Sequence, residues 1–469
     1  MKFTKIIKEN YILISILFLA IILRLISLNQ SFWLDETTSG YVARDFNFGQ
    51  IIKGFAPGDF HPPFYYLLLR GWGLLFGFSE VALRSLSVVL GVGSVWIIYK
   101  IAKEMGLKHP ELASTILATS GLYIYFSQEA RMYILASFLV LLSFLFFVKI
   151  LKKGRAGDYI GFAISLGLCT MTHYLTLTMI PVYWLIGVIN KKDFIWWKKF
   201  IASHIIMLGF YILWTPLLLK QIKNGLSVSL TAPSWWIVLG KTTIKEILLI
   251  PIKFTIGRIS FDNKIVYAFV IVFSLSIFGY LLFKAIKSLK KSYPIFLWLT
   301  TPLFLAIIFG LKVSVFSYFR LLFILPAYYL LVAIGLSDLN KRKRIVFLIL
   351  ILFINISTSL IYLTNSKFQR EDWRGITSYI RNNSSFSSIV LFPATTGTEA
   401  FRYYAPDISY RVKNSVEGYN EVWLMRYSQA IFDPTDSTRK SVENEGYKEV
   451  EEKDFNGVGV IRYIKTKSI

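Results

Sequence analysis

Two adjacent carboxylates, Asp35 and Glu36, stand where the first long apolar run of the chain ends. A polar and aromatic cluster, His61–Tyr66, follows them. Placing a charge at hydrocarbon depth costs about 2.5 to 3.5 kcal/mol on insertion scales, so carboxylates beside a spanning segment suggest a functional site. A carboxylate at such a place can accept the proton of a hydroxyl nucleophile. Taken alone, the pair also fits an ordinary solvated helix end.

The composition shows what kind of protein must position these carboxylates. Of the 469 residues, 55% are hydrophobic, and the apolar residues occur in long runs, which is typical of a polytopic membrane protein. The formal net charge is +24, and nearly all of the excess lies before Ser366. Basic loops beside anionic lipid headgroups account for this excess, so we expect membrane lipid as a partner and no nucleic acid.

About eleven apolar runs approach the roughly 20 residues that a helix needs to cross a bilayer. They cover residues 11–28, 81–101, 111–127, 131–149, 158–172, 174–189, 200–219, 265–283, 294–311, 319–336 and 345–363. We therefore predict an all-α polytopic membrane protein with about 11 transmembrane helices.

The distribution of Lys and Arg predicts the orientation of these spans. If residues 62–77 do not cross the membrane, every basic cluster between the spans falls on one side, as the positive-inside rule requires. We therefore predict an interfacial helix at 62–77, within a first external loop at 29–80, and a cytoplasmic N-terminus at the plasma membrane. Because successive spans alternate in direction, the same assignment places the basic loop 220–264 outside. Its interleaved aromatic and basic residues indicate headgroup contact, or a long loop that translocates regardless of its charge.

The tail has a different pattern from the rest of the chain. Residues 370–380 have a helical period, whereas Ser388–Phe392 and Val458–Ile464 are typical of strands. We predict a transmembrane domain at 1–365 followed by a small extracytoplasmic α/β domain at 366–469. The single cysteine, Cys169, excludes an intramolecular disulfide.

This topology brings polar residues from separate stretches to the external ends of the spans. They are Asp35, Glu36, Asp59, His61, Glu129, Arg131 and His173. Walker loops, Gly-rich dinucleotide turns and Ser-His-Asp motifs are absent from the sequence, so nucleotide phosphoryl transfer and hydride transfer lack support. Because cytoplasmic nucleotide sugars do not reach an external site, a lipid-phosphate-linked sugar donor fits best.

Sugar transfer from such a donor needs a base for the acceptor hydroxyl and cations for the leaving phosphate. Asp35 could be the base, and Arg131, Arg320 or the lysines of 220–264 could meet the phosphate. Arg131 could instead pair with Glu129 or extend its charged end to the interface from a helix end, and His173 could be an interfacial anchor.

Five motifs in this order resemble the bacterial and archaeal branch of the protein O-mannosyltransferase-like glycosyltransferases, which have the GT-C fold. They are Trp33–Glu36, His61–Arg70, Glu80–Ser87, Ser127–Tyr133 and Thr172–Leu175; Phe319–Leu322 and Glu371–Arg374 resemble later landmarks of that branch. The resemblance implies inverting transfer from a polyprenyl-phosphate-linked sugar and interfacial helices in the first external loop. It also implies that Asp35 is the catalytic base and that Glu36 supports it.

The chain departs from the protein mannosyltransferases at Tyr65 and Tyr66, where they have Gly-Lys. This departure leaves the acceptor open among a lipid, a glycan and a protein.

The resulting hypothesis is an integral-membrane glycosyltransferase with defined residue roles. Asp35 is the base, with Glu36 and Glu129 shaping the acceptor or metal site. His61, Arg131, His173 and Arg320 bind the sugar or phosphate, and use of a divalent metal is left open. The alternatives are a flippase or transporter for lipid-linked sugars, which would place ionisable residues near the midplane, and a non-catalytic membrane scaffold.

Overall fold

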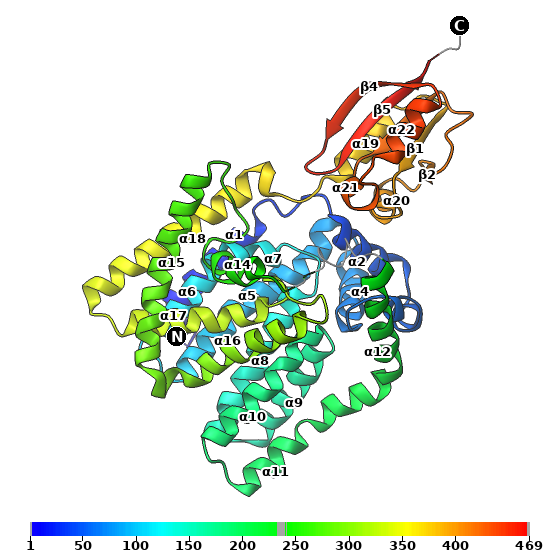
Figure 1. Cartoon of the computed structure of the whole chain (residues 1–469). Coiled ribbons are helices and arrows are strands. Elements are labelled where there is room, and N and C mark those ends of the chain that lie inside the picture. Colours follow the sequence, from blue (N-terminus) through cyan, green and yellow to red (C-terminus); the bar gives the residue numbers. More distant parts are fainter. Residues whose placement is uncertain (1, 232–239, 241, 467–469) are drawn as a thin grey trace.

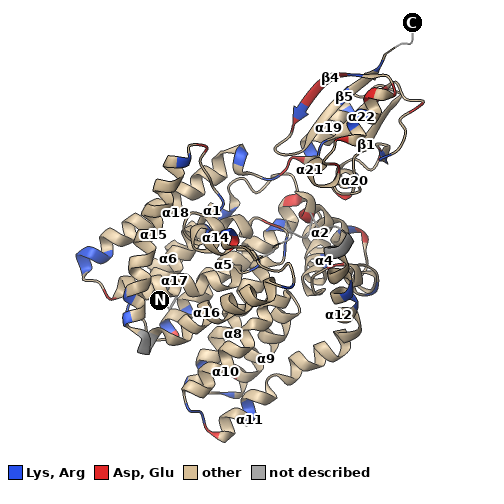
Figure 2. Cartoon of the chain, viewed as in Figure 1, with Lys and Arg blue, Asp and Glu red and all other residues tan. Residues whose placement is uncertain are grey.

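The computed structural model describes residues 2–231, 240 and 242–466. A large bundle of helices makes up most of this part of the chain, and a small sheet with its own helices lies at one corner of the bundle (Figure 1). Charged residues colour only short stretches of the bundle (Figure 2). The mostly helical architecture with a small C-terminal sheet is as predicted, whereas the predicted count of about 11 transmembrane helices stays a prediction.

The helices of the bundle follow the apolar runs of the sequence. Their bounds are α1 Lys2–Leu25, α2 Leu34–Asp45, α3 Phe48–Gln50, η1 Ile51–Phe55, η2 Ala56–Gly58, α4 Phe64–Phe76, α5 Glu80–Glu104, α6 Pro110–Thr119, α7 Gly121–Ser127, α8 Tyr133–Lys152, α9 Ala156–Thr170, η3 Tyr174–Thr178, α10 Met179–Ile189, α11 Phe194–Ala202, α12 Ile205–Thr231, α14 Ile244–Ile256, α15 Lys264–Lys287, α16 Leu289–Gly310, η4 Leu322–Ile324, α17 Leu325–Ser337 and α18 Lys341–Thr364, followed by the short turn η5 Ser366–Phe368.

Six helical segments in the described ranges are long and apolar enough to cross a membrane. They are Glu80–Glu104, Tyr133–Lys152, Phe194–Ser227, Lys264–Lys287, Ser292–Gly310 and Lys341–Thr364. Shorter apolar helices match four more of the predicted runs, at Tyr11–Leu25, Ala156–Thr170, Tyr174–Ile189 and Leu322–Ser337. The multi-pass helical architecture is therefore as predicted, whereas the number of spans and the orientation of the chain stay predictions.

The apolar run 111–127 is not one continuous helix, contrary to the prediction. Ser120 ends α6 and begins α7 with an extended backbone (φ −61°, ψ 117°). Its hydroxyl accepts a hydrogen bond from the backbone N–H of Tyr123 at 3.3 Å and is bonded to the Tyr329 hydroxyl at 2.7 Å. A serine in this position caps the second helix, so hydropathy alone hides the break.

Much of the predicted basic loop 220–264 is helical. The helix α12 continues to Thr231, and α14 forms farther on. The Gln221 side-chain amide donates to the backbone oxygens of Ala56 at 2.7 Å and His61 at 3.0 Å, which holds α12 against the first predicted external loop. The predicted headgroup contact at residues 235–239 lies outside the described part of the chain.

The C-terminal sheet has five strands in the order β2-β1-β3-β5-β4. The elements of this unit are α19 Trp373–Asn383, β1 Ser388–Phe392, α20 Thr398–Tyr404, β2 Tyr410–Val412, β3 Glu421–Met425, α21 Gln429–Phe432, α22 Ser437–Asn444, β4 Tyr447–Asp454 and β5 Gly459–Lys465. Strand β1 pairs in parallel with β2 and β3, and β5 pairs antiparallel with β3 and β4.

Both faces of this sheet are covered. Val390 and Trp423 pack on one face with residues of α19 and α20, and Leu391 packs on the other face with Val442 of α22. Alternate residues of a strand point to opposite faces, so strands covered on both sides contain near-continuous apolar runs.

Candidate active site

The candidate residues converge at one end of the bundle. Asp35 and Glu36 lie in the first turn of α2, and His61 precedes α4. Glu129 and Arg131 lie between α7 and α8, whereas His173 begins η3 after α9. Ion pairs, hydrogen bonds and ring contacts join residues from all these segments. The predicted grouping is therefore seen in the structure, although the catalytic roles remain untested.

Asp35 is the open carboxylate of the group, with 39% of its side chain exposed. Its Oδ2 lies 3.3 Å from Nη2 of Arg131, whose side chain is only 6% exposed. Arg131 Nη1 also lies 3.4 Å from the backbone oxygen of Asp35 and 3.5 Å from the Tyr66 hydroxyl. The guanidinium therefore joins α2 to α4 and fixes the direction of the carboxylate.

Glu36 has no exposed side-chain surface. Arg84 holds it bidentately, with Nε 2.8 Å from Oε1 and Nη2 2.5 Å from Oε2. Arg370 Nε lies 3.2 Å from Oε2, and the backbone N–H of Ala130 donates to Oε1 at 2.7 Å. Burial favours the neutral acid, but the two arginines and this N–H lower the pKa of Glu36 below its ordinary value. This carboxylate therefore connects four chain segments and is closed to solvent.

Glu129 is also buried, but only one of its oxygens has a partner. Trp33 Nε1 donates to Oε1 at 2.9 Å, whereas Oε2 is buried without a hydrogen bond in the described structure. Burial raises the pKa of Glu129 to about 7, the nearby Glu36 charge also acts to raise it, and Arg370 opposes the shift. The ion pair that Arg131 forms is with Asp35, and the alternative pairing with Glu129 is not seen among the described residues.

A second cluster lies beside Arg131. Asp59 accepts a hydrogen bond from the Tyr66 hydroxyl at 2.8 Å, and its Oδ2 lies 3.5 Å from His61 Nδ1. Burial opposes ionisation of Asp59, but His61, Arg131 and Tyr66 together lower its pKa to about 2. The His61 and His173 rings lie 5.8 Å apart, and burial holds the pKa of His173 well below its usual range. This side of the group therefore holds an ionised carboxylate and a neutral imidazole.

Arg320 reaches the group from the turn before η4. Its Nη1 donates to the backbone oxygen of Ser314 at 2.7 Å, and it interacts electrostatically with Asp35 and Tyr133. A mobile anion placed between Arg320 and Arg131 would meet two cations.

The sequence prediction missed several residues that shape the site. Arg84 and Arg370 neutralise Glu36, and the Arg370 guanidinium lies 4.5 Å from the centroid of the Tyr125 ring. Arg258 contacts the Tyr125 hydroxyl. Arg84 lies within the motif Glu80–Ser87 and Arg370 directly precedes Glu371, so their positions in or beside motifs were the only signal.

Within the described ranges, no three His, Cys, Asp or Glu side chains are grouped so that they could hold a metal ion. The described residues therefore give no candidate set of ligands for the divalent metal whose use the sequence left open.

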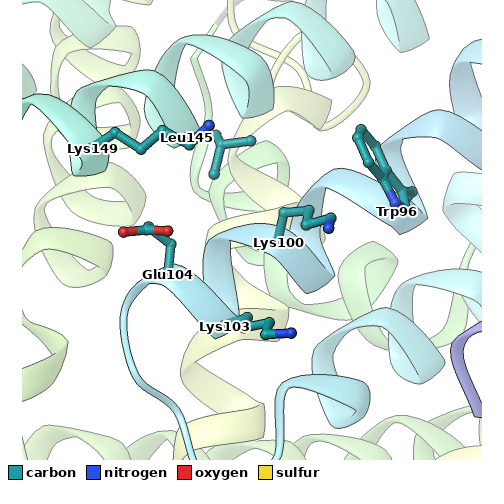
Figure 3. Close-up of a pocket in the computed structure, with 6 residues that line it drawn as sticks. All are labelled: Trp96, Lys100, Lys103, Glu104, Leu145 and Lys149. Atoms are coloured by element: carbon teal, nitrogen blue, oxygen red, sulfur yellow. The ribbon is translucent and has the colours of Figure 1, made fainter. Parts of the chain in front are cut away.

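A cavity of about 380 Å³ lies far from this group, at the opposite ends of α5 and α8 (Figure 3). It is lined by Trp96, Lys100, Lys103, Glu104, Leu145 and Lys149. Twenty helical residues separate Arg84 from Glu104 along α5, a rise of roughly 30 Å at 1.5 Å per residue. The cavity is therefore a separate feature of the molecule.

Comparison with known proteins gives the fold. Residues 60–219 match the family model described as dolichyl-phosphate-mannose-protein mannosyltransferase. The match includes His61, Arg131 and His173 but begins after Asp35. No curated protein sequence matches the chain.

Solved structures resemble nearly the whole chain. ArnT from Cupriavidus metallidurans in the apo state is 10% identical with a TM-score of 0.62, covering 96% of this chain and 97% of its own. ArnT bound to undecaprenyl phosphate is 10% identical with a TM-score of 0.61, covering 98% and 99%. The oligosaccharyltransferase AglB from Archaeoglobus fulgidus, in complex with an inhibitory peptide and a dolichol-phosphate, is 12% identical with a TM-score of 0.52, covering 99% and 75%.

Proposed function

From the GT-C fold that these matches share, we propose that the chain is an integral-membrane inverting glycosyltransferase. It transfers a sugar from a polyprenyl-phosphate donor to a lipid, glycan or protein acceptor at the outer face of the membrane. The observation that carries the proposal is the contrast among three carboxylates: Asp35 is open and held by Arg131, whereas Glu36 and Glu129 are buried.

Asp35 is the general base in this proposal. The acceptor hydroxyl oxygen forms a bond to the anomeric carbon while the bond from that carbon to the donor phosphate oxygen breaks. The hydroxyl proton passes to the Asp35 carboxylate, and the polyprenyl phosphate leaves with the bonding electron pair. A positioned base of this kind contributes about 10²- to 10⁴-fold to rate.

Arginines stabilise the departing phosphate. Arg131 and Arg320 both interact with Asp35, so a phosphate bound near them lies close to the base. Guanidinium groups suit phosphate because their planar fork donates two parallel hydrogen bonds. The undecaprenyl phosphate bound to ArnT and the dolichol-phosphate bound to AglB support this class of donor.

Glu36 positions the site and does not touch substrate in this proposal. Its bonds to Arg84 and to the Ala130 N–H tie the first turn of α2 to α5 and to the segment carrying Arg131. Removing one partner of such a buried pair leaves an uncompensated charge and costs about 3–5 kcal/mol. We therefore assign Glu36 a structural role, which is how it supports Asp35 as the resemblance implies.

The test compares Asp35→Asn with Asp45→Asn in purified protein. Asp45 lies at the other end of α2, and its side chain is 37% exposed and paired with Arg44 at 2.9 Å. Membrane lipid extract from the producing cells serves as the donor and acceptor pool, and mass spectrometry measures release of polyprenyl phosphate. We expect Asp35→Asn to lose about 10²-fold or more of the rate, and Asp45→Asn to keep it.

Two outcomes would contradict the proposal. Full activity of Asp35→Asn would remove Asp35 as the base. If the unmodified protein moves the intact sugar-linked lipid across a vesicle membrane and does not cleave its sugar–phosphate bond, the transporter alternative is favoured.

A further inference from the structure

The helix that carries Asp35 has no cap of its own. The residue before its first turn is Trp33, which has extended backbone angles (φ −83°, ψ 172°) but makes no capping bond through its side chain. The first N–H groups of a helix have no partners within the helix, and Ser, Thr, Asp or Asn normally accepts from them at this position. The Trp33 indole has a donor but no acceptor, so it cannot serve as this cap, and its Nε1 donates to Glu129.

The missing acceptor comes from the C-terminal unit. Glu371 Oε2 lies 3.2 Å from the backbone nitrogen of Leu34, the first residue of α2. The same oxygen accepts from Trp373 Nε1 at 2.8 Å, and Oε1 accepts from the Tyr427 hydroxyl at 3.0 Å. Both donors belong to the C-terminal unit, so its own side chains orient the Glu371 carboxylate toward α2.

Other bonds between the two units surround this contact. The Tyr404 hydroxyl accepts from the Phe32 N–H at 2.7 Å and donates to Glu80 at 3.0 Å. The Arg374 N–H donates to the Ser31 hydroxyl at 3.0 Å. The chain leading into α2 is therefore held by residues that follow it by more than three hundred positions. In Figure 1 the C-terminal unit lies directly beside α2.

We propose that the C-terminal unit builds the active site by capping α2 from a distant part of the chain, with Glu371 as a positioning residue for Asp35. Asp35 directly follows the capped Leu34, so a frayed first turn would release its carboxylate from Arg131. The Glu371 carboxylate also lies at the positive end of the helix dipole, which favours its ionised form, whereas burial raises its pKa. The catalytic part of this inference rests on the proposed function, whereas the capping part does not.

The test compares three variants of the full chain. Glu371→Ala removes the acceptor, and Glu371→Gln keeps an oxygen that can accept from the Leu34 N–H. Glu399→Ala is the matched control, because Glu399 also belongs to the C-terminal unit and contacts α2, but it accepts from the Thr38 hydroxyl at 3.0 Å and from no backbone N–H of the first turn.

Hydrogen–deuterium exchange of a peptide spanning residues 32–40 measures the cap without any substrate. Loss of an N-cap destabilises a helix start by an amount that corresponds to roughly tenfold in an opening equilibrium. We expect Glu371→Ala to exchange about tenfold faster, with Glu371→Gln and Glu399→Ala close to the unmodified chain. Unchanged exchange in Glu371→Ala would overturn the capping role.

Transfer kinetics then test the positioning role. We expect kcat of Glu371→Ala to fall about tenfold with KM nearly unchanged, and Glu371→Gln to recover most of it. A rise in KM alone, or no rescue by Gln, would overturn positioning of Asp35. If the unmodified chain transfers no sugar, the proposed function fails while the exchange result still decides the cap.

Discussion

Asp35, Glu36 and Glu129 lie in one cluster but differ in how much water reaches them and in how many donors they meet. Asp35 is open and forms an ion pair with Arg131, Glu36 is closed and has several donors, and Glu129 is closed with one oxygen that has no hydrogen bond in the described structure. Carboxylates in such different environments suit different tasks. We propose that Asp35 acts as a base, Glu36 as a structural anion and Glu129 as a group that is easily protonated.

The pH dependence of stability follows from Glu129. Burial raises its pKa from the ordinary 4.5 to about 7, so the folded protein holds this proton where the unfolded chain has lost it. The stabilising contribution is therefore fully present below about pH 4.5 and is lost as pH rises to about 7. The loss is on the order of 1.4 kcal/mol for each pH unit in this window.

Glu129→Gln isolates this effect because the amide oxygen can still accept from Trp33. We expect the thermal midpoint of the variant in detergent to fall less between pH 4.5 and 7 than that of the unmodified chain. Parallel midpoint curves across this pH range would show that Glu129 does not hold the extra proton.

At the scale of elements, the Ser120 side chain caps α7 at the break between α6 and α7. Ser120 is buried, and its hydroxyl both accepts from the Tyr123 N–H and bonds to Tyr329. Ser120→Ala should therefore destabilise the protein by about 1–2 kcal/mol, the cost of a lost cap and a lost buried hydrogen bond, while the Tyr329 hydroxyl still donates to the backbone oxygen of Phe254. Thermal unfolding measures this as a lower midpoint. Ser276→Ala is the control, because Ser276 is exposed and bonds only within its own helix in the described structure; an equal loss in both variants would contradict the role of Ser120.

The elements also show what the sequence could predict and what it could not. Long apolar runs predict α5, α8, α15 and α18 because hydropathy over about 20 residues is a strong signal. The strand Ser388–Phe392 has the bounds that its pattern predicts. The Ser120 break escapes prediction because one polar residue barely changes a hydropathy average.

The site is predictable only where motif residues mark it. Acidic and basic residues at the predicted external span ends are enough to group Asp35, Arg131 and His173 from the sequence alone. The pairing of Glu36 with Arg370 joins segments 334 positions apart, as the residue numbers show, and nothing in local sequence specifies such a contact. The Glu371 cap could not be predicted from the sequence either, because capping rules consider only residues adjacent to the helix in sequence, and Glu371 lies far from α2.

At the scale of the whole molecule, the bundle and the C-terminal unit share the candidate site. Arg370 and Glu371 both contact the start of α2, at Glu36 and Leu34. A site assembled from both ends of the chain requires the C-terminal unit to lie on the same side of the membrane as Asp35. The orientation of this unit is therefore tied to the face at which the proposed transfer occurs.

Cysteine labelling tests this orientation, because Cys169 is the single cysteine and is buried. In a Cys169→Ala background, Lys448→Cys places an exposed thiol in β4, and Lys103→Cys places one in the last turn of α5. The positive-inside rule puts Lys103 in the cytoplasm and the C-terminal unit outside. An impermeant maleimide should therefore label Lys448→Cys in intact cells and Lys103→Cys only after the membrane is permeabilised, with the Cys169→Ala background unlabelled. The reverse pattern would place Asp35 and the proposed donor site on the wrong face for transfer outside the cell. Labelling of both introduced thiols in intact cells would instead contradict the predicted cytoplasmic position of Lys103.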